Sequence, residues 1–160
     1  MKSNQEIAAI LDNAASHAKA TSQISTSQEI SLDDAYDIQA KSIARRYERG
    51  EKLVGLKLGF TSKAKMEQMG VHDMIWGRLT DSMHFENGAD VPKSNFIHPR
   101  AEPEIAFLIK KDITEPLTLE NAAEYIEGIA AAIEIIDSRY ENFKFSLEDV
   151  IADNCSSTGF

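Results

Sequence analysis

Apolar residues recur three and four positions apart in the first third of the chain, and two amphipathic patterns result. Such spacing is typical of helices that pack one face on a core, and it predicts helices over residues 4–19 and 31–50. Ser31 and Asp34 form a capping box at the start of the second pattern. Residues 21–30, between the two, are rich in Ser, Thr and Gln and predict a polar linker outside the core.

The pattern changes after residue 50, where alternating and continuous apolar runs replace the helical period. The elements predicted there are a strand over 52–60, a short helix over 61–70, turns and short strands over 71–99, a strand over 102–110, a helix over 118–128, a strand over 129–137 and a helix over 146–154. This order indicates an α+β protein with an N-terminal helical region, residues 1–50, and a β-rich region, residues 51–160.

Composition narrows the class of protein. The chain has 160 residues, 42% of them hydrophobic, and a net charge of −9 with scattered Lys and Arg, which argues against a nucleic-acid surface. A single cysteine fits a reducing cytoplasm, and no apolar run is long enough for a membrane span. We therefore expect a cytoplasmic protein without nucleic-acid or membrane partners.

Three glutamates fall in stretches that predict buried strands. Glu102 and Glu104 are two residues apart and so point to the same side of a strand, while Glu134 interrupts the apolar run "IAAAIEIID". A divalent cation would relieve such buried charge, and carboxylates without His or Cys favour Mg²⁺ or Mn²⁺. Alternatively, Glu102 and Glu104 face solvent on an edge strand, and Glu134 pairs with Arg139 or a lysine.

Four segments, in order, resemble the fumarylacetoacetate hydrolase superfamily, in its branch of 2-hydroxypentadienoate hydratases and 4-oxalocrotonate decarboxylases. They are "GLKLGFTSKAKMEQMGV" (55–71), "HPRAEPEIAF" (98–107), "AAIEIIDSRYENFKF" (131–145) and "VIADNCSS" (150–157). Within this branch, the segments "DSRYENFKF" and "ADNCSS" favour the decarboxylase over the hydratase. The resemblance implies part of a mixed β-sandwich roll whose C-terminal half is missing, because relatives continue well beyond "SSTGF" (156–160).

The resemblance also implies roles for particular residues. It makes Glu102, Glu104 and Glu134 ligands of Mg²⁺ or Mn²⁺, makes Lys57 the active-site lysine, and matches Asp81 to an acidic position that is a candidate acid or base. The alternatives without a catalytic role are that Lys57 faces outward on a half-exposed strand and that Asp81 forms a turn. Three hydroxyl residues could bind a substrate carboxylate or act only as helix caps: Thr61, Ser62 and Ser156.

The reaction so implied is the decarboxylation of 2-oxo-3-hexenedioate to 2-hydroxypenta-2,4-dienoate in aromatic meta-cleavage catabolism. The sibling reaction, hydration of 2-hydroxypenta-2,4-dienoate, would use the same ligands. A third possibility is an inactive fragment or a non-catalytic partner subunit. Because apolar stretches such as "IAAAIEII" would be poorly covered in a chain of this length, we also expect a homo-oligomer or a hetero-oligomer with a hydratase.

Overall fold

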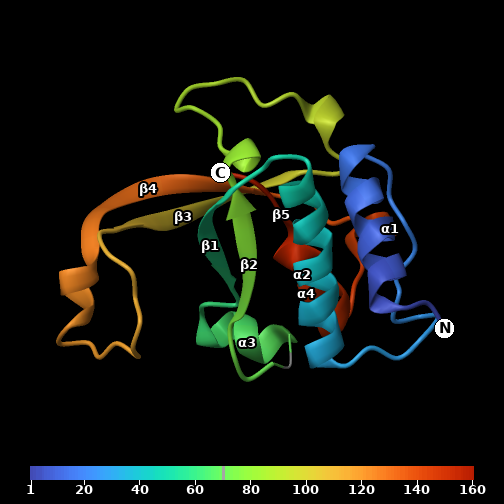
Figure 1. Cartoon of the computed structure of the whole chain (residues 1–160), viewed down its shortest axis with the longest axis horizontal. Helices are drawn as coiled ribbons and strands as arrows, with labels where there is room; N and C mark the ends of the chain where they lie inside the picture. The colour runs from blue at the N-terminus through green and yellow to red at the C-terminus, as the bar shows by residue number, and fades with distance from the viewer. Residues whose placement is uncertain (70) are drawn as a thin grey trace.

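The computed structural model describes residues 1–69 and 71–160, which form a helical layer beside two antiparallel sheets (Figure 1). The helices are α1 (Asn4–Ser16), α2 (Leu32–Glu48), α3 (Lys63–Met69) and α4 (Leu147–Ala152), and the strands are β1 (Leu53–Gly59), β2 (Ile75–Thr80), β3 (Arg100–Ile109), β4 (Ile126–Ile136) and β5 (Ser157–Gly159). The predicted α+β class is confirmed. No helix in the described part of the chain is long and apolar enough to cross a membrane.

The two long N-terminal helices pack side by side, and α4 packs against α2 (Figure 1). The caps explain where they begin: Ser3 and Glu6 form a capping box on α1, and the Ser31 side chain accepts a hydrogen bond from the Asp34 N–H on α2. The buried Asp12 carboxylate of α1 binds Arg45 of α2 and Arg49, the residue that follows α2, both at 2.7 Å. Both helices predicted from the apolar period are therefore present, with α1 ending three residues earlier than its pattern.

The segment between these helices is not the uncovered linker that its composition predicts. Ile24 and Ile30 are both buried, and they belong to the same core cluster as Ile7 of α1 and Ile38 of α2. A bridge between Thr21 and Tyr140 ties the segment to the C-terminal part of the chain. Two apolar side chains are enough to fix this polar stretch against the body, so the prediction was wrong on this point.

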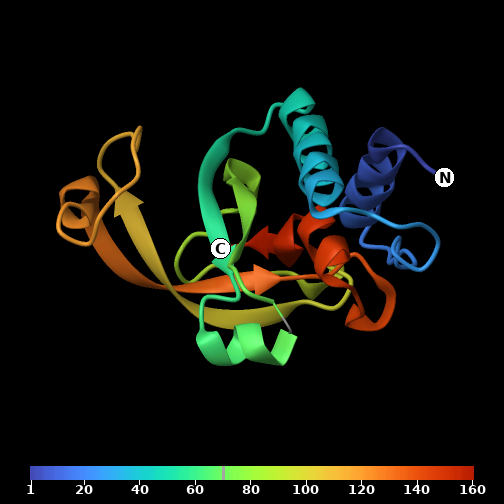
Figure 2. The ribbon, with the colours of Figure 1, turned by 90° about the horizontal axis from the view of Figure 1, so that it is seen from below.

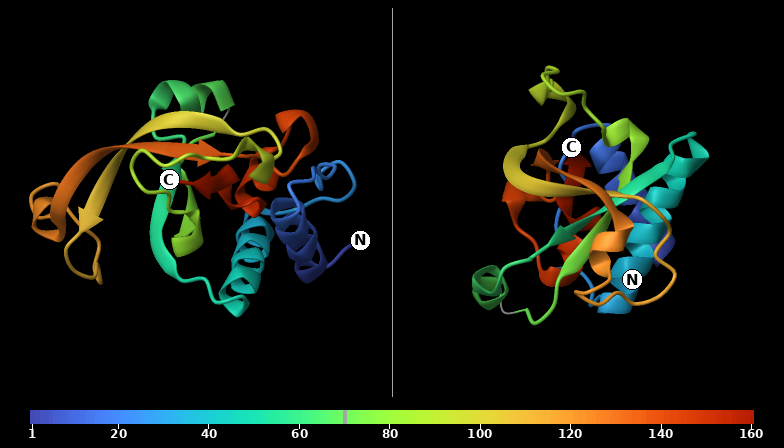
Figure 3. Two further views of the ribbon diagram at one scale, coloured as in Figure 1. Left: turned by 90° about the horizontal axis from the view of Figure 1, so that it is seen from above. Right: turned by 90° about the vertical axis from the view of Figure 1, so that its left-hand side faces the viewer.

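The strand predicted over 52–60 is confirmed as β1, which pairs with β2 in a two-stranded sheet. Helix α3 follows β1 as predicted, although its predicted end at Gly70 lies outside the described residues. The second sheet has the order β3-β4-β5, and β3 and β4 form a long antiparallel hairpin. The far end of this hairpin extends away from the helices (Figure 2; Figure 3, left).

The helix predicted over 118–128 was wrong. The chain forms only a short 3₁₀ turn at Ala122–Tyr125 and enters β4 at Ile126. Ile126 pairs with Ile109, and Gly128 pairs with Leu108 across a register shift in β3. Pairing with β3 thus outweighs the local helical pattern, because a short isolated helix is only marginally stable in water, whereas the strand gains cross-strand contacts with β3.

The prediction that β3 is buried was also wrong, since every residue of β3 is exposed. Alternation assigns Pro103, Ile105 and Phe107 to one face of the hairpin together with Ile129 and Ile133 of β4. This face is apolar, and Ile105 and Ile129 are 65% and 66% exposed. The poor cover expected for "IAAAIEII" is therefore observed at these positions. The opposite face of the hairpin carries the acidic residues.

Candidate functional site

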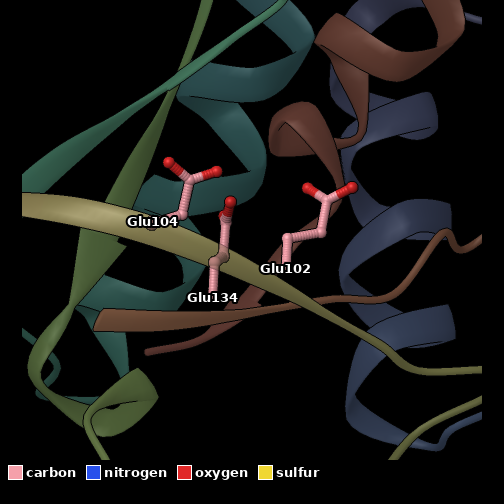
Figure 4. Close-up of side chains that lie close together, drawn as sticks. All are labelled: Glu102, Glu104 and Glu134. Carbon is pink, nitrogen blue, oxygen red and sulfur yellow. The ribbon is translucent and has the colours of Figure 1, made fainter. Parts of the chain in front are cut away.

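Three glutamate side chains meet on the second face of the β3–β4 hairpin. Glu102 lies directly opposite Glu134 in the strand register, and Glu104 is the next residue of β3 on the same side. One carboxylate oxygen from each of the three residues lies within 4.8 Å of the other two. Figure 4 shows the three carboxylates pointing into the same space above the hairpin. The strand register thus brings together the three predicted ligands.

The three carboxylates differ in their exposure to water. Glu102 and Glu104 are exposed, whereas the Glu134 residue is only 5% exposed. Burial raises the pKa of Glu134; Lys57 opposes this effect, and the charges of Glu102 and Glu104 add to it. A buried carboxylate beside two others gains from a cation that all three can share. Of the three, Glu134 is the residue whose ionised form most needs such a partner.

Lys57 reaches this cluster from β1. Its Nζ lies 3.0 Å from Oε2 of Glu134 and donates a hydrogen bond to the Cys155 carbonyl at 3.3 Å. Only 11% of the Lys57 side chain is exposed, so the outward-facing lysine considered from the sequence is not what the fold contains. The expected pairing of Glu134 with a lysine occurs through Lys57. Arg139, the other candidate, binds the buried Asp153.

The turn that follows α4 supplies the next part of the site. Asn154, Cys155 and Ser156 all have positive φ values of 51–59°, a conformation that is rare for residues other than glycine. Asn154 holds the turn on β2 by exchanging hydrogen bonds of 2.7 and 2.8 Å with the Arg78 backbone. A Cβ at Gly77 would lie 2.6 Å from the Asn154 carbonyl, so glycine is needed for this close contact. This turn ends at Ser156, which lines a cavity together with Glu102 and Glu104.

Ser156 is 3% exposed, and its hydroxyl has no hydrogen-bond partner among the described residues. A buried hydroxyl without a partner is uncommon and marks a place where a bound molecule would restore the missing bond. The neighbouring Cys155 packs inside the turn: its thiol lies 3.1 Å from the Trp76 carbonyl, and burial raises its pKa to about 12.

A cavity of about 810 Å³ opens beside the cluster and collects most of the predicted residues. Its wall includes Lys57, Thr61, Ser62, Glu102, Glu104 and Ser156. Glu134 lies beneath this wall, in contact with Lys57. The start of α3 brings Thr61 and Ser62 to the wall, after a positive φ of 57° at Phe60 turns the chain out of β1.

Asp81 is the predicted residue that lies elsewhere. It follows β2 at the opposite end of the β1–β2 ladder, where Leu53 pairs with Thr80, and it is exposed. Its carboxylate accepts hydrogen bonds from the Lys52 N–H at 2.9 Å and the Ser82 N–H at 3.0 Å. This is the turn-forming alternative considered from the sequence, and Asp81 does not line the cavity.

The sequence analysis did not single out several residues of the cavity wall, among them Arg100, Phe143 and Lys144. Arg100 could have been found, because it stands two residues before Glu102 and so shares its face of β3. Phe143 gave no such signal. Its position depends on two successive residues of positive φ, Asn142 at 59° and Phe143 at 57°.

The donor set fits a hard divalent cation. Carboxylate oxygens are the ligands that Mg²⁺ and Mn²⁺ prefer, and the open side toward the cavity leaves room for water or substrate oxygens. No described His or Cys joins the group that would favour zinc instead. A cation at this point would also stabilise the ionised form of Glu134, whose pKa is raised by burial.

Comparison with known proteins finds similarity to 4-oxalocrotonate decarboxylases and to related hydratases. No profile of a known protein family matches the chain. It is 52% identical over 154 residues to a 4-oxalocrotonate decarboxylase from Pseudomonas sp., covering 96% of this chain and 60% of the relative. A 2-hydroxypent-2,4-dienoate hydratase from Pseudomonas putida is 41% identical over 130 residues, which are 80% of this chain and 59% of the relative.

The solved structures agree with these relatives. A 4-oxalocrotonate decarboxylase from Pseudomonas putida G7, complexed with magnesium and adipate, matches with a TM-score of 0.93 at 39% identity. The match covers 98% of this chain and 60% of that one. The same enzyme complexed with calcium and acetate gives a TM-score of 0.90. The chain is thus a homologue of these decarboxylases and hydratases, as its segments predicted, over about 60% of the decarboxylases' length.

Proposed function

We propose that the protein represented by this chain decarboxylates 2-oxo-3-hexenedioate to 2-hydroxypenta-2,4-dienoate with the help of Mg²⁺ or Mn²⁺. The observation that carries the proposal is the convergence of Glu102, Glu104 and Glu134 beside Lys57 at the edge of a cavity. Two solved structures of a similar decarboxylase, one with magnesium and one with calcium, support the binding of a divalent metal ion. The chain is 52% identical to one decarboxylase, against 41% to one hydratase, and this difference supports decarboxylation.

The three carboxylates would hold the cation on the cavity side of the hairpin. A bound Mg²⁺ or Mn²⁺ would act as a Lewis acid toward the 2-oxo group of the substrate. The Ser156 hydroxyl, which has no partner among the described residues, would donate to the carboxylate next to the 2-oxo group. Thr61 and Ser62 at the start of α3 are further candidates for contacts to that carboxylate.

Decarboxylation breaks the bond between C5 and the terminal carboxyl carbon, which leaves as CO₂. The electron pair moves through the C3–C4 double bond to the 2-oxo oxygen, so that negative charge develops there. Lys57 is placed to stabilise this charge and to give a proton to the oxygen, which completes the 2-hydroxy group of the product. Its contact with Glu134 keeps the ammonium on the side of the ligands.

The exposed apolar face of the hairpin supports association with another protein surface. The face is a row of four exposed apolar side chains: Ile105, Phe107, Ile129 and Ile133. Contact with another protein would remove this apolar surface from water, which is favourable. A homo-oligomer, or a complex with a hydratase that takes up the dienol product, would cover it. The buried free Cys155 is compatible with a cytoplasmic location, which we propose for the protein.

The two sibling reactions are separated by an assay of the purified chain with Mg²⁺. Decarboxylation predicts CO₂ release from 2-oxo-3-hexenedioate that stops when EDTA removes the metal. Water addition to 2-hydroxypenta-2,4-dienoate without CO₂ release would instead identify a hydratase. If neither reaction occurs and Mg²⁺ does not stabilise the fold, the chain is an inactive fragment or a partner subunit and the proposal fails.

A further inference from the structure

A third charged residue shares the acidic face of β3. Arg100 is the first residue of the strand, and Arg100, Glu102 and Glu104 are two residues apart, so their side chains leave the same face. All three line the cavity. Two residues of extended strand cover roughly 7 Å and four cover roughly 13 Å. Arg100 therefore starts one to two side-chain lengths away from the cation ligands, along a single straight element.

The guanidinium of Arg100 is held by an aromatic ring. Its Cζ lies 3.7 Å from the centroid of the Phe143 ring. Phe143 is fixed in turn by His98 and Phe145, with ring centroids 5.1 and 5.7 Å away. A planar guanidinium stacked on a ring uses its face for that contact and keeps the N–H groups at its edge free for other partners.

Among the described residues, no carboxylate occupies those N–H groups. Within residues 1–69 and 71–160, Arg100 has no ion pair, although Glu102 stands two residues away on the same strand. An arginine edge presents two parallel N–H donors, which match the two oxygens of a carboxylate. Arg100 thus offers a carboxylate-binding group at one end of the cavity, and the three glutamates define a cation-binding group nearby.

We propose that Arg100, stacked on Phe143, binds the substrate carboxylate that lies farthest from the 2-oxo group and makes the site selective for dicarboxylates. This inference rests on the proposed function, because it takes the glutamate end of the cavity as the place of the 2-oxo acid group. A six-carbon chain separates its two carboxyl carbons by roughly 6 Å when extended, which suits the spacing between Arg100 and the ligands.

The chemistry of the reaction gives this contact a recognisable kinetic effect. The distant carboxylate leaves as neutral CO₂, so its interaction with Arg100 weakens as the reaction proceeds. A contact that is stronger in the bound substrate than in the transition state raises affinity without raising the rate of the chemical step. Loss of Arg100 should therefore raise KM and leave kcat unchanged or higher, unlike the loss of a catalytic group.

Lys144 provides the matched control, because it is a second exposed cation on the cavity wall that has no ion pair among the described residues. Its flexible ammonium lacks both the aromatic support and the paired donors of Arg100. If charge alone decided the preference, Lys144→Gln and Arg100→Gln would have similar effects. We expect them to differ.

The test compares two unreactive acids, 2-oxoadipate and 2-oxohexanoate, which differ only in the second carboxylate. Binding to the 160-residue chain is measured by calorimetry with Mg²⁺ and with EDTA. The wild type should bind 2-oxoadipate at least about tenfold more tightly, which is near the lower end of what hydrogen bonds to a charged group contribute. Arg100→Gln should reduce the ratio to about one, Arg100→Lys should restore part of it, and Lys144→Gln should keep it.

The outcomes separate this inference from the proposed function. Mg²⁺-dependent binding of 2-oxohexanoate by Arg100→Gln shows that the variant is folded and that its metal site is intact. If the wild type binds both acids equally in the presence of Mg²⁺, or if Lys144→Gln and not Arg100→Gln removes the preference, the role of Arg100 is refuted and the metal site stands. If the wild type binds neither acid in an Mg²⁺-dependent manner, the proposed function is refuted, and the inference with it.

Discussion

Replacement of Lys57 by Met should lower the rate of CO₂ release by about 10²- to 10⁴-fold, the range expected for the loss of a proton-transferring group. Methionine keeps most of the length and apolar volume of the lysine stem but lacks the ammonium that lies 3.0 Å from Glu134. The charge that develops on the 2-oxo oxygen then loses its nearest cationic side chain and its proton source. Steady-state kinetics with saturating Mg²⁺ give the measurement.

The same variant should keep its response to metal. Lys57 holds a positive charge next to a predicted ligand, so its removal takes away a repulsion that opposes cation binding. We expect Mg²⁺ to raise the melting temperature of Lys57→Met at least as much as that of the wild type. Lys52→Met is the control, since Lys52 is an exposed residue next to the same strand. Unchanged turnover in Lys57→Met would contradict the assigned role.

Replacement of Glu134 by Gln should abolish most of the stabilisation that Mg²⁺ provides. Metal at 100 times its dissociation constant stabilises a folded protein by about 2.7 kcal/mol, which for a domain of this size raises Tm by roughly 5–10 °C. A neutral amide is a much weaker ligand than a carboxylate. If the affinity falls by about 100-fold, the stabilisation at the same concentration falls to about 0.4 kcal/mol.

The control for this experiment is Glu127→Gln, an exposed glutamate on the same strand. It makes the same chemical change without touching the cluster, and it should keep the full thermal shift. Differential scanning calorimetry with Mg²⁺ and with EDTA provides the comparison. An equal shift in the wild type and Glu134→Gln would show that Glu134 is not a ligand.

The elements that follow from local sequence were predictable. The helical period and the Ser31 cap lie within a few residues of one another, so they predicted α2 without knowledge of the fold. Alternation likewise placed Glu102 and Glu104 on one side of a strand. Glu134 is different, because its place opposite Glu102 depends on the register of two strands that a loop of 16 residues separates. Buried charge suggested a cation shared with the pair and the family resemblance supported it, but neither gave the register.

The elements that depend on distant partners were not predictable in the same way. The helix pattern of 118–128 gave way to pairing between Ile126 and Ile109. The apolar composition of β3 predicted burial, yet the described chain contains nothing that covers Ile105. The turn at 154–156 combines three residues of positive φ, and none of them is a glycine, the residue that would have predicted such a conformation. Contacts with β2 stabilise it, and those appear only in the fold.

The central claim is that three glutamates bind one divalent cation, and anomalous diffraction from crystals soaked in Mn²⁺ tests it most directly. The account predicts one strong peak on the cavity side of the hairpin, roughly 2.2 Å from an oxygen of each of Glu102, Glu104 and Glu134. A site that omits Glu134, or no peak at a Mn²⁺ concentration that saturates the thermal shift, would contradict it.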